Sequence, residues 1–215
     1  MNLNTGMKLF LALLFHLLIS CVRTTPHSHI DQQGLNVQPD DCDNPDADIA
    51  CCFVNMPEAL TNVMTIASQD EPGERLIISG KIFKSDGVTS YPDVILYSYH
   101  TDHTGHYTKK GNERGFQKWH GHLHGWCKSD SNGLYEIHSI RPARYPQNLF
   151  PAHIHAAVKT TDGQMYFVND FVFKDDSLVD DKYISSLSAP GGTGITDLKR
   201  DENNIWRGER DMVLR

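Results

Sequence analysis

The sequence SDSNGLYEIHSIRPARYPQNLFPAHIHAAV, residues 129–158, contains two β-type runs joined by a stiff connection. A turn sequence at 130–133 leads into the first run, at 134–140, and the second run follows at 152–158. Between them, Pro142 and Pro146 restrict the backbone on either side of Tyr145. The stretch therefore predicts two strands and a rigid segment that can direct a tyrosine side chain inward.

Short β-type runs separated by turn residues continue through most of the chain. They lie at 76–83, 94–100, 134–140, 152–158 and 165–173, with turn sequences at 85–87 and 161–163. The sequence shows no long helical period and no internal repeat. We therefore predict an all-β fold, an antiparallel β-sandwich with long loops and a loop-rich tail from about Ser185. One short helix is expected over 55–67, where Asn55 and Pro57 are helix-start signals.

The N-terminal sequence has the layout of a secretory signal peptide. One lysine precedes an apolar run from Leu9 to about Val22, and polar sequence follows. A buried helix and a bacterial lipoprotein signal ending at Cys21 are the alternatives. We expect a signal peptide at 1–24, a polar, mobile lead-in at 25–55 and one sandwich domain at 56–215. This organisation predicts a secreted protein with no membrane segment in its mature form.

Charge and cysteine content narrow the class further. The net charge is -7 with a pI near 5.9, which argues against a general nucleic-acid binder. Four cysteines remain after the predicted signal, and an even number in a secreted chain favours two disulfides. Adjacent cysteines bond to each other poorly, so we expect Cys42 to bond to Cys51 or Cys52. The remaining one of that pair would then bond to Cys127.

Two histidine motifs are candidates for metal binding. Side chains at alternate positions of a strand share a face, so His153 and His155 would present two imidazoles to one metal ion. His120, His122 and His124 also alternate, with spacing that would suit zinc or copper, but they lie in a segment rich in glycine and tryptophan. We interpret that segment as a solvated loop and keep the zinc or copper site as an alternative.

The order Tyr107, Tyr145 and then Pro-Ala-His-Ile-His resembles the intradiol ring-cleavage dioxygenases, a family that includes the catechol and protocatechuate dioxygenases. The stretches GERLIISGKIFKSDG and NIWRGERDMVL are similar to core and closing strands of that family, so the resemblance covers roughly residues 70–215. It implies a non-haem Fe(III) ion held by Tyr107, Tyr145, His153 and His155.

The chemistry of this ligand set is consistent on physical grounds. Fe(III) is a hard ion that favours anionic oxygen donors and accepts imidazole. Two tyrosinates and one hydroxide would cancel the +3 charge, and a neutral cluster costs less to bury between the sheets. The resemblance implies that a catechol dianion displaces hydroxide and Tyr145, and that O2 then cleaves the ring to a cis,cis-muconate-type diacid.

The resemblance also suggests residues around the substrate. Gln164 in GQMYF matches a glutamine that the family places beside the substrate, and we assign it a catalytic role with Tyr145. Phe150 stands where the family commonly has an arginine, and Arg144 or Arg141 would have to compensate. We expect the loops that bear Asp93, Tyr97, Gln147 and Phe150 to shape the substrate pocket.

This chain is short and is expected to carry disulfides, and in both respects it is similar to the stand-alone secreted dioxygenase-like proteins of fungi and plant-feeding arthropods such as mites. That similarity suggests detoxification of plant catechols and polyphenols outside the cell. Because the helical dimerisation segment of the family is missing, we expect a monomer. The alternatives are an extracellular β-sandwich binding module with weakened catalysis, and the zinc or copper protein described above.

Overall fold

The computed structural model describes residues 39–147 and 149–215, which form strands, two short α-helices and two short 3-10 helices. The strands are β1 (Val63–Thr65), β2 (Arg75–Phe83), β3 (Ile95–His100), β4 (His124–Lys128), β5 (Leu134–Ile140), β6 (His153–Lys159), β7 (Met165–Phe167), β8 (Phe171–Phe173), β9 (Ile195–Thr196), β10 (Lys199–Arg200), β11 (Trp206–Glu209) and β12 (Met212–Val213). The helices are η1 (Pro39–Cys42), η2 (Ile49–Phe53), α1 (Gln117–His120) and α2 (Asp181–Ser186).

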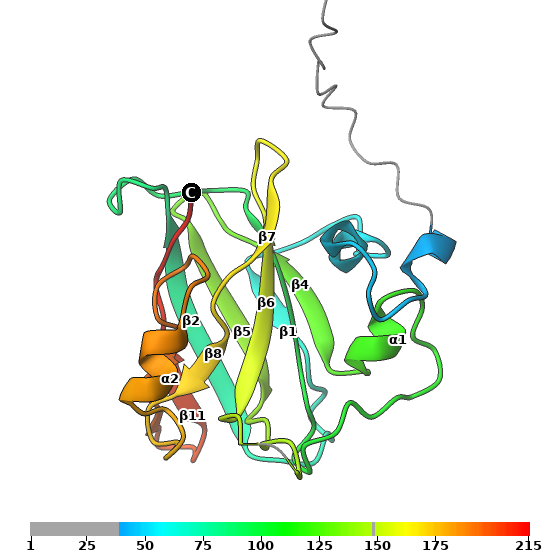
Figure 1. Cartoon of the computed structure of the whole chain (residues 1–215). Coiled ribbons are helices and arrows are strands. Elements are labelled where there is room, and N and C mark those ends of the chain that lie inside the picture. Colours follow the sequence, from blue (N-terminus) through cyan, green and yellow to red (C-terminus); the bar gives the residue numbers. More distant parts are fainter. Residues whose placement is uncertain (1–38, 148) are drawn as a thin grey trace, which may run out of the picture. The chain divides into compact units, whose positions relative to one another are not determined.

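The strands form two sheets that pack as a β-sandwich (Figure 1). The first sheet has the order β1-β5-β2-β11-β10, with β12 also paired to β2. The second has the order β4-β3-β6-β8-β9, with β7 paired to β6. The predicted all-β sandwich is confirmed, and each of the five predicted runs contains a strand; the run at 165–173 divides into β7 and β8.

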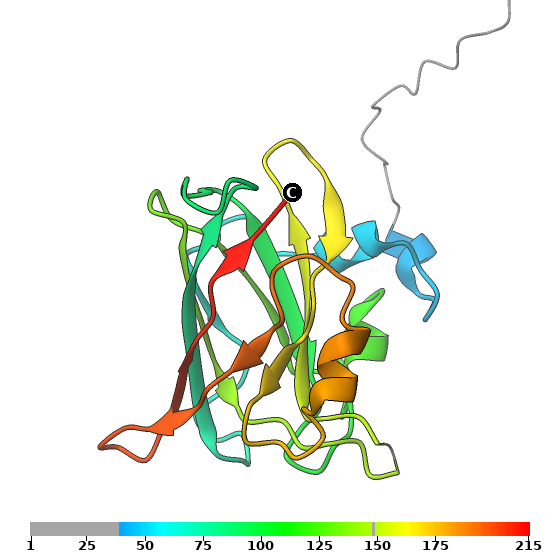
Figure 2. The ribbon, with the colours of Figure 1, turned by 60° about the vertical axis from the view of Figure 1, so that its left-hand side comes forward.

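The sheets are mixed, whereas the sequence predicted a purely antiparallel sandwich. Strands predicted from the sequence pair antiparallel, as β2 does with β5 and β3 with β6. Two further strands add parallel pairs: β1, which was not predicted, pairs with β5, and β11, within the expected closing strand, pairs with β2. Figure 2 shows the C-terminal strands, in red, running alongside β2, in teal. A Cβ at Gly80 would lie 1.8 Å from the Arg210 carbonyl oxygen, so β2 needs glycine where this segment crosses it.

Two apolar clusters stabilise the fold. The larger fills the space between the sheets and includes Ile78, Ile137 and Ile154. The smaller lies on the outer face of the second sheet, where Cys52 and Phe53 pack with Tyr97. The described part of the lead-in, from residue 39, is therefore folded against the sandwich, whereas the sequence predicted a mobile segment. Its apolar residues are anchored because the Trp126 indole donates a hydrogen bond to the Cys52 carbonyl oxygen at 2.8 Å.

One sequence prediction about secondary structure is wrong. The short helix expected over 55–67 does not form, because Asn55 has a left-handed φ of 65° and residues 63–65 pair with β5 as strand β1. The helical turn instead precedes it, at η2. The tail beyond Ser185 is rich in loop, as predicted, and its short strands β9 to β12 also complete both sheets.

One of the two expected disulfides is present, between Cys42 and Cys51. Cys52 and Cys127 are both buried as free thiols, so the expected bridge between the lead-in and Cys127 is not formed. Cys127 points into the core between the sheets, while Cys52 lies in the cluster on the outer face. The second sheet itself separates the two sulfur atoms.

The predicted signal peptide at 1–24 lies outside the described residues. Among the residues that the structure does describe, no helix is long and apolar enough to cross a membrane.

Candidate metal centre and active site

His153 and His155 project from the same face of β6, as the alternation predicts. The Nδ1–H of His153 donates to the Pro151 carbonyl oxygen at 2.7 Å. The Nδ1–H of His155 donates to Asp170 Oδ1 at 3.0 Å. These contacts leave both Nε2 atoms directed to one point, 3.1 Å apart.

Tyr107 and Tyr145 bring their hydroxyl groups to the same point from two different loops. Their oxygen atoms are 2.6 Å apart, and each lies 3.1–3.4 Å from the Nε2 of His155. Tyr145 is also 3.2 Å from the Nε2 of His153. The structure therefore brings together all four side chains predicted as metal ligands.

This centre lies on the outer face of the second sheet, whereas we expected it between the two sheets. His155 and Tyr99 are neighbours on β6 and β3, and they share the face that carries Tyr97. The alternate residues Ile154 and Ala156 point into the core instead. Loops cover the face, so the site is partly buried without interrupting the packing between the sheets.

The loop that carries Tyr107 is fixed by Asp102. Its carboxylate accepts hydrogen bonds from the backbone N–H of Thr104 and His106 and from the hydroxyl of Thr108. A Cβ at Gly105 would lie 2.1 Å from the Arg144 carbonyl oxygen. This close approach sets the loop directly against the segment that carries Tyr145.

Asp176 holds the other two ligand-bearing segments together. Its side chain, 4% exposed, forms an ion pair with Arg144, the residue before Tyr145. It also accepts a hydrogen bond of 2.9 Å from the N–H of Ala152, the residue before His153. One buried carboxylate thus fixes the start of β6 relative to the Tyr145 segment.

The electrostatics of the cluster fit a metal cation. Burial raises the pKa of Tyr107 and of Tyr145, and burial lowers the pKa of His153. Without a cation the phenols stay protonated and can donate to the imidazole Nε2 atoms. A hard cation at the centre would replace these protons, favour tyrosinate and accept the electron pairs of both Nε2 atoms. The residues present therefore fit a non-haem Fe(III) ion.

Asp170 belongs to the surroundings of this cluster. One ligand atom from each of His153, His155 and Asp170 lies within 4.8 Å of the others. The Asp170 carboxylate, however, already accepts the Nδ1 proton of His155. A carboxylate behind a metal-binding histidine orients the ring and increases its basicity. We assign Asp170 this orienting role.

A pocket of about 290 Å³ opens onto the cluster. Its lining residues are Tyr145, Phe150, Pro151, His153, His155, Asp170 and Tyr183. Phe150 is the only one of the predicted substrate-binding residues in this lining. Tyr107 lies behind Tyr145 and does not line the pocket, so Tyr145 is the phenol that an incoming ligand meets.

The remaining predicted pocket residues lie elsewhere and do not line the pocket. Arg144 is held by Asp176, and Gln147 is exposed outside the lining. Asp93 pairs with Lys128 at 3.3 Å, at the end of β3 remote from Tyr99.

Tyr97 and Gln164 are also separate from the pocket. Tyr97 is completely buried in the outer-face cluster, where its hydroxyl contacts His120. Gln164 lies in the β6–β7 hairpin, where its amide donates to Asp162 at 2.8 Å, at the end of β6 opposite to His153. The catalytic role assigned to Gln164 is therefore wrong, because the short hairpin keeps this side chain at the far end of the strand.

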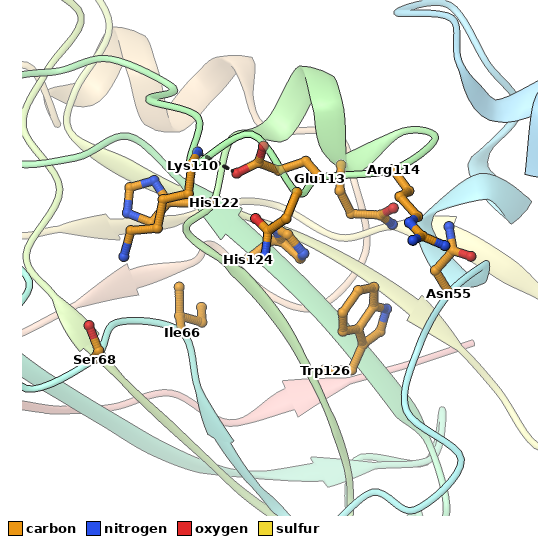
Figure 3. A pocket seen from close by; sticks show the side chains of 11 residues that line it. Asn55, Ile66, Ser68, Lys110, Glu113, Arg114, His122, His124 and Trp126 are labelled. Atoms are coloured by element: carbon orange, nitrogen blue, oxygen red, sulfur yellow. Dashed lines mark hydrogen bonds between the residues drawn. The ribbon is translucent and has the colours of Figure 1, made fainter.

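The alternative histidine cluster does not assemble. His120 stacks on Tyr99 with ring centroids 3.5 Å apart. His122 and His124 line a separate cavity of about 390 Å³, which Figure 3 shows together with Lys110 and Glu113. Among the described residues, these three histidines do not bring their ring nitrogens together as a metal-binding group. The segment is also not a loop throughout, since His124 begins β4.

Three acidic residues and one tyrosine of the site were missed in the sequence. Asp102, Asp170 and Asp176 hold or orient the ligand-bearing segments, and Tyr183 on α2 lines the pocket. None of the four carries a signal in the sequence. In the structure, the β6–β8 register, with Ile154 opposite Phe171, places Asp170 beside His155.

The fold and the four converging donors define a class of protein, a β-sandwich in which two tyrosines and two histidines converge on one point of a sheet face. Residues 50–209 match the sequence profile of the Dioxygenase family, and the chain belongs to that family. The resemblance to intradiol dioxygenases is confirmed. The family consists of ring-cleaving oxidoreductases that generally use non-haem Fe(III). No curated protein sequence matches the chain significantly.

Solved structures with the same fold include three bacterial enzymes. The dioxygenase domain of a carbohydrate-binding fusion from Streptomyces sp. SirexAA-E is 16% identical, with a TM-score of 0.55 over 74% of this chain and 91% of that chain. 3-Chlorocatechol 1,2-dioxygenase from Rhodococcus opacus 1CP is 18% identical, with a TM-score of 0.56 over 74% of this chain and 67% of that chain. Catechol 1,2-dioxygenase from Acinetobacter sp. ADP1 is 19% identical, with a TM-score of 0.53 over 72% of this chain and 57% of that chain. The chain therefore spans little more than half the length of this last enzyme.

Proposed function

We propose that this chain is a non-haem Fe(III) intradiol dioxygenase that cleaves catechols with O2. The observation that carries the proposal is the convergence of the Tyr107 and Tyr145 hydroxyls with the Nε2 atoms of His153 and His155. When bound, Fe(III) would chelate the catechol and make its ring reactive toward O2. The four side chains named here would hold the ion.

The protein residues would then control charge and protons. Tyr107 and Tyr145 as tyrosinates contribute two negative charges next to a trivalent cation. Tyr145 is the phenol that faces the pocket, so its oxygen can accept one proton from an arriving catechol. The hydrogen bonds from His153 to Pro151 and from His155 to Asp170 keep each imidazole oriented while this proton moves.

The product, location and assembly state are part of the same proposal. We propose a cis,cis-muconate-type diacid as the product, and secretion with removal of the signal peptide. We further propose a monomer that detoxifies plant phenolics. The disulfide between Cys42 and Cys51 supports an oxidising compartment.

Purified protein loaded with iron provides the test. We expect one iron per chain, a burgundy colour from tyrosinate-to-Fe(III) charge transfer, and oxygen uptake on addition of catechol. The product should carry both atoms of labelled O2, which mass spectrometry measures.

Two results would overturn the proposal in different ways. A colourless protein that retains zinc or copper would exclude the tyrosinate–iron centre. A coloured protein that consumes no oxygen with any catechol would favour the binding module. Size-exclusion chromatography with light scattering tests the monomer separately.

A further inference from the structure

The pocket over the ligand cluster has an unusual charge pattern. Three of the proposed metal ligands line it, and among the other described lining residues the one charged side chain is Asp170. Among the described residues, neither lysine nor arginine lines the pocket. The Asp170 side chain is 31% exposed, so a bound molecule can approach its carboxylate directly.

The nearby arginines are engaged in other contacts. The Arg144 guanidinium donates to Asp176 through Nε at 2.9 Å. Arg141 forms a two-pronged ion pair with Asp175, at 2.9 and 2.7 Å. These two guanidinium groups are neutralised outside the pocket.

Arg210 is the remaining cation near Asp170. It is 5% exposed, and its Nη2 donates to the carbonyl oxygens of Asn169 at 2.7 Å and Gly191 at 3.2 Å. Its guanidinium packs over the Phe171 ring at 4.1 Å. Arg210 therefore sits behind Asp170 in the protein interior, where a substrate substituent cannot contact it.

The other walls of the pocket are aromatic. Phe150 is 56% exposed at the pocket mouth, and Tyr183 lines the pocket from α2. Aromatic surface of this kind binds flat, apolar groups and carries no positive charge to balance an anion, although the Tyr183 hydroxyl is a neutral donor. A ring substituent that extends from the cluster would therefore contact aromatic side chains and one carboxylate.

From this lining we infer the substrate class: the enzyme selects uncharged catechols with apolar or aromatic substituents and discriminates against catechols that carry a carboxylate. Asp170 is the specificity-determining residue, through repulsion of a second negative charge. The inference rests on the proposed function, because it assumes that the diol binds at the tyrosine–histidine cluster.

Anaerobic binding to the iron-loaded protein tests the inference without turnover. Dissociation constants for 4-methylcatechol and for 3,4-dihydroxybenzoate, measured by calorimetry, compare a neutral with an anionic substituent at one ring position. We expect the benzoate to bind roughly tenfold more weakly or worse. Asp170→Asn keeps an oxygen that accepts the His155 proton. It should reduce the ratio of the dissociation constant of the benzoate to that of 4-methylcatechol to about threefold or less.

Two further variants complete the design. Asp162→Asn removes the same charge from the remote β6–β7 hairpin, and its ratio should equal that of the wild type. Phe150→Lys adds a cation at the pocket mouth without touching the contact between Asp170 and His155. It should favour the benzoate, so the inference stays testable if Asp170→Asn loads iron poorly.

The outcomes separate the two levels of the proposal. Equal binding of both catechols by wild type, or a ratio unaffected by both Asp170→Asn and Phe150→Lys, would overturn the selectivity while leaving the dioxygenase intact. A protein that binds iron but neither catechol would overturn the proposed function and the selectivity with it.

Discussion

Tyr107 and Tyr145 share a contact of 2.6 Å at a place where burial opposes ionisation of both phenols. Their pKa values are raised, so two tyrosinates can coexist there only beside a strong positive charge. The pair is thus more informative about the metal than the histidines, because imidazole pairs bind many divalent ions.

Tyr107→Phe should therefore weaken iron binding by roughly 100-fold or more, since outer partners alone are worth 10–100-fold. The visible charge-transfer band should weaken as well, because one of two tyrosinates is lost. Tyr99→Phe is the control, as its ring packs 6.0 Å from that of Tyr107 and its hydroxyl is not in the cluster. Unchanged iron affinity in Tyr107→Phe would exclude Tyr107 as a ligand.

Adjacent Asp175 and Asp176 provide a matched comparison of exposed and buried carboxylates. Asp176→Ala removes the ion pair with Arg144 and leaves the N–H of Ala152 unpaired, so it should cost about 3 kcal/mol of unfolding free energy. Asp175→Ala breaks a surface ion pair and should cost less than about 1 kcal/mol. Urea unfolding of the two variants measures the difference. Equal costs would contradict the role of Asp176 as the link between the Tyr145 segment and β6.

The strands that the sequence predicted are those with their own local signal. Runs such as Leu134–Ile140 lie between good turn sequences, which fix their ends. Strands of two residues, such as β9 and β10, have no such signal, because their neighbours in the sheet determine them. β4 was not predicted because Gly125 is an unfavourable residue for a strand interior. A Cβ at this position would lie 2.9 Å from Met64, so the glycine allows close packing there.

Substituting two glycines of the Tyr107 loop distinguishes the cost of backbone strain alone from the cost of a steric clash with a neighbouring segment. Gly105 and Gly111 both have left-handed φ values, of 85° and 93°. Alanine at Gly111 meets open space and should cost about 1 kcal/mol. Alanine at Gly105 would collide with the Arg144 carbonyl oxygen and displace Tyr107, so both melting temperature and iron affinity should fall well below those of Gly111→Ala. Equal iron affinity in the two variants would contradict the docking of this loop.

His100 connects β3 to β5 across the sandwich, and its burial makes stability depend on pH. Its Nδ1–H donates to the Thr101 carbonyl oxygen, and its Nε2 accepts from the Ser139 hydroxyl at 2.6 Å. Burial lowers the pKa of His100 to about 4. Below its ordinary pKa of about 6.5 the unfolded chain gains a proton that the folded chain excludes. Stability should therefore fall by about 3 kcal/mol from pH 6.5 to 4, where the loss ends.

Urea unfolding between pH 7 and 4 measures this dependence. His100→Gln should flatten it, because glutamine does not titrate, whereas His103→Gln changes an exposed histidine and should leave the slope unaltered. A wild-type slope that persists in His100→Gln would assign the acid sensitivity to other groups.

At the scale of the whole molecule, the convergence of the four proposed metal ligands was predictable and their supports were not. A tyrosine beside proline and a Pro-Ala-His-Ile-His string mark three of these side chains within one short passage. Asp102, Asp170 and Asp176 all occupy sequence that is typical of ordinary turns. Asp102 bonds within its own loop, whereas Asp170 and Asp176 gain their partners only when β6 and the Tyr145 segment pack beside them. The side of the sheet that carries the site was likewise undetermined, because either face of β6 could have been covered.

The two faces of the second sheet also give a prediction about thiols. Burial raises the pKa of Cys52 and of Cys127 to about 12, so neither should react with a disulfide reagent at pH 8 in the folded protein. In denaturant, a variant without Cys21 should show two reactive thiols, because Cys42 and Cys51 remain bonded. No reactive thiol in denaturant would reveal a second disulfide and contradict the separation of Cys52 from Cys127.

The position of β2 between partners remote in sequence has a consequence for the rate of folding. Lys81 on β2 contacts Asp211, 130 residues away, and β2 also pairs with β5 and β11. Each of these pairings closes a long loop of chain, so the entropy of loop closure is lost before the contacts of the pairing stabilise it. Folding should accordingly take milliseconds to seconds, as in other sandwiches, and the β6–β7 hairpin should form before β2 is enclosed. Binding of iron to the proposed site should then be limited by the slow pairing of these strands. Stopped-flow refolding with and without the metal would show whether folding or metal binding is the rate-limiting step.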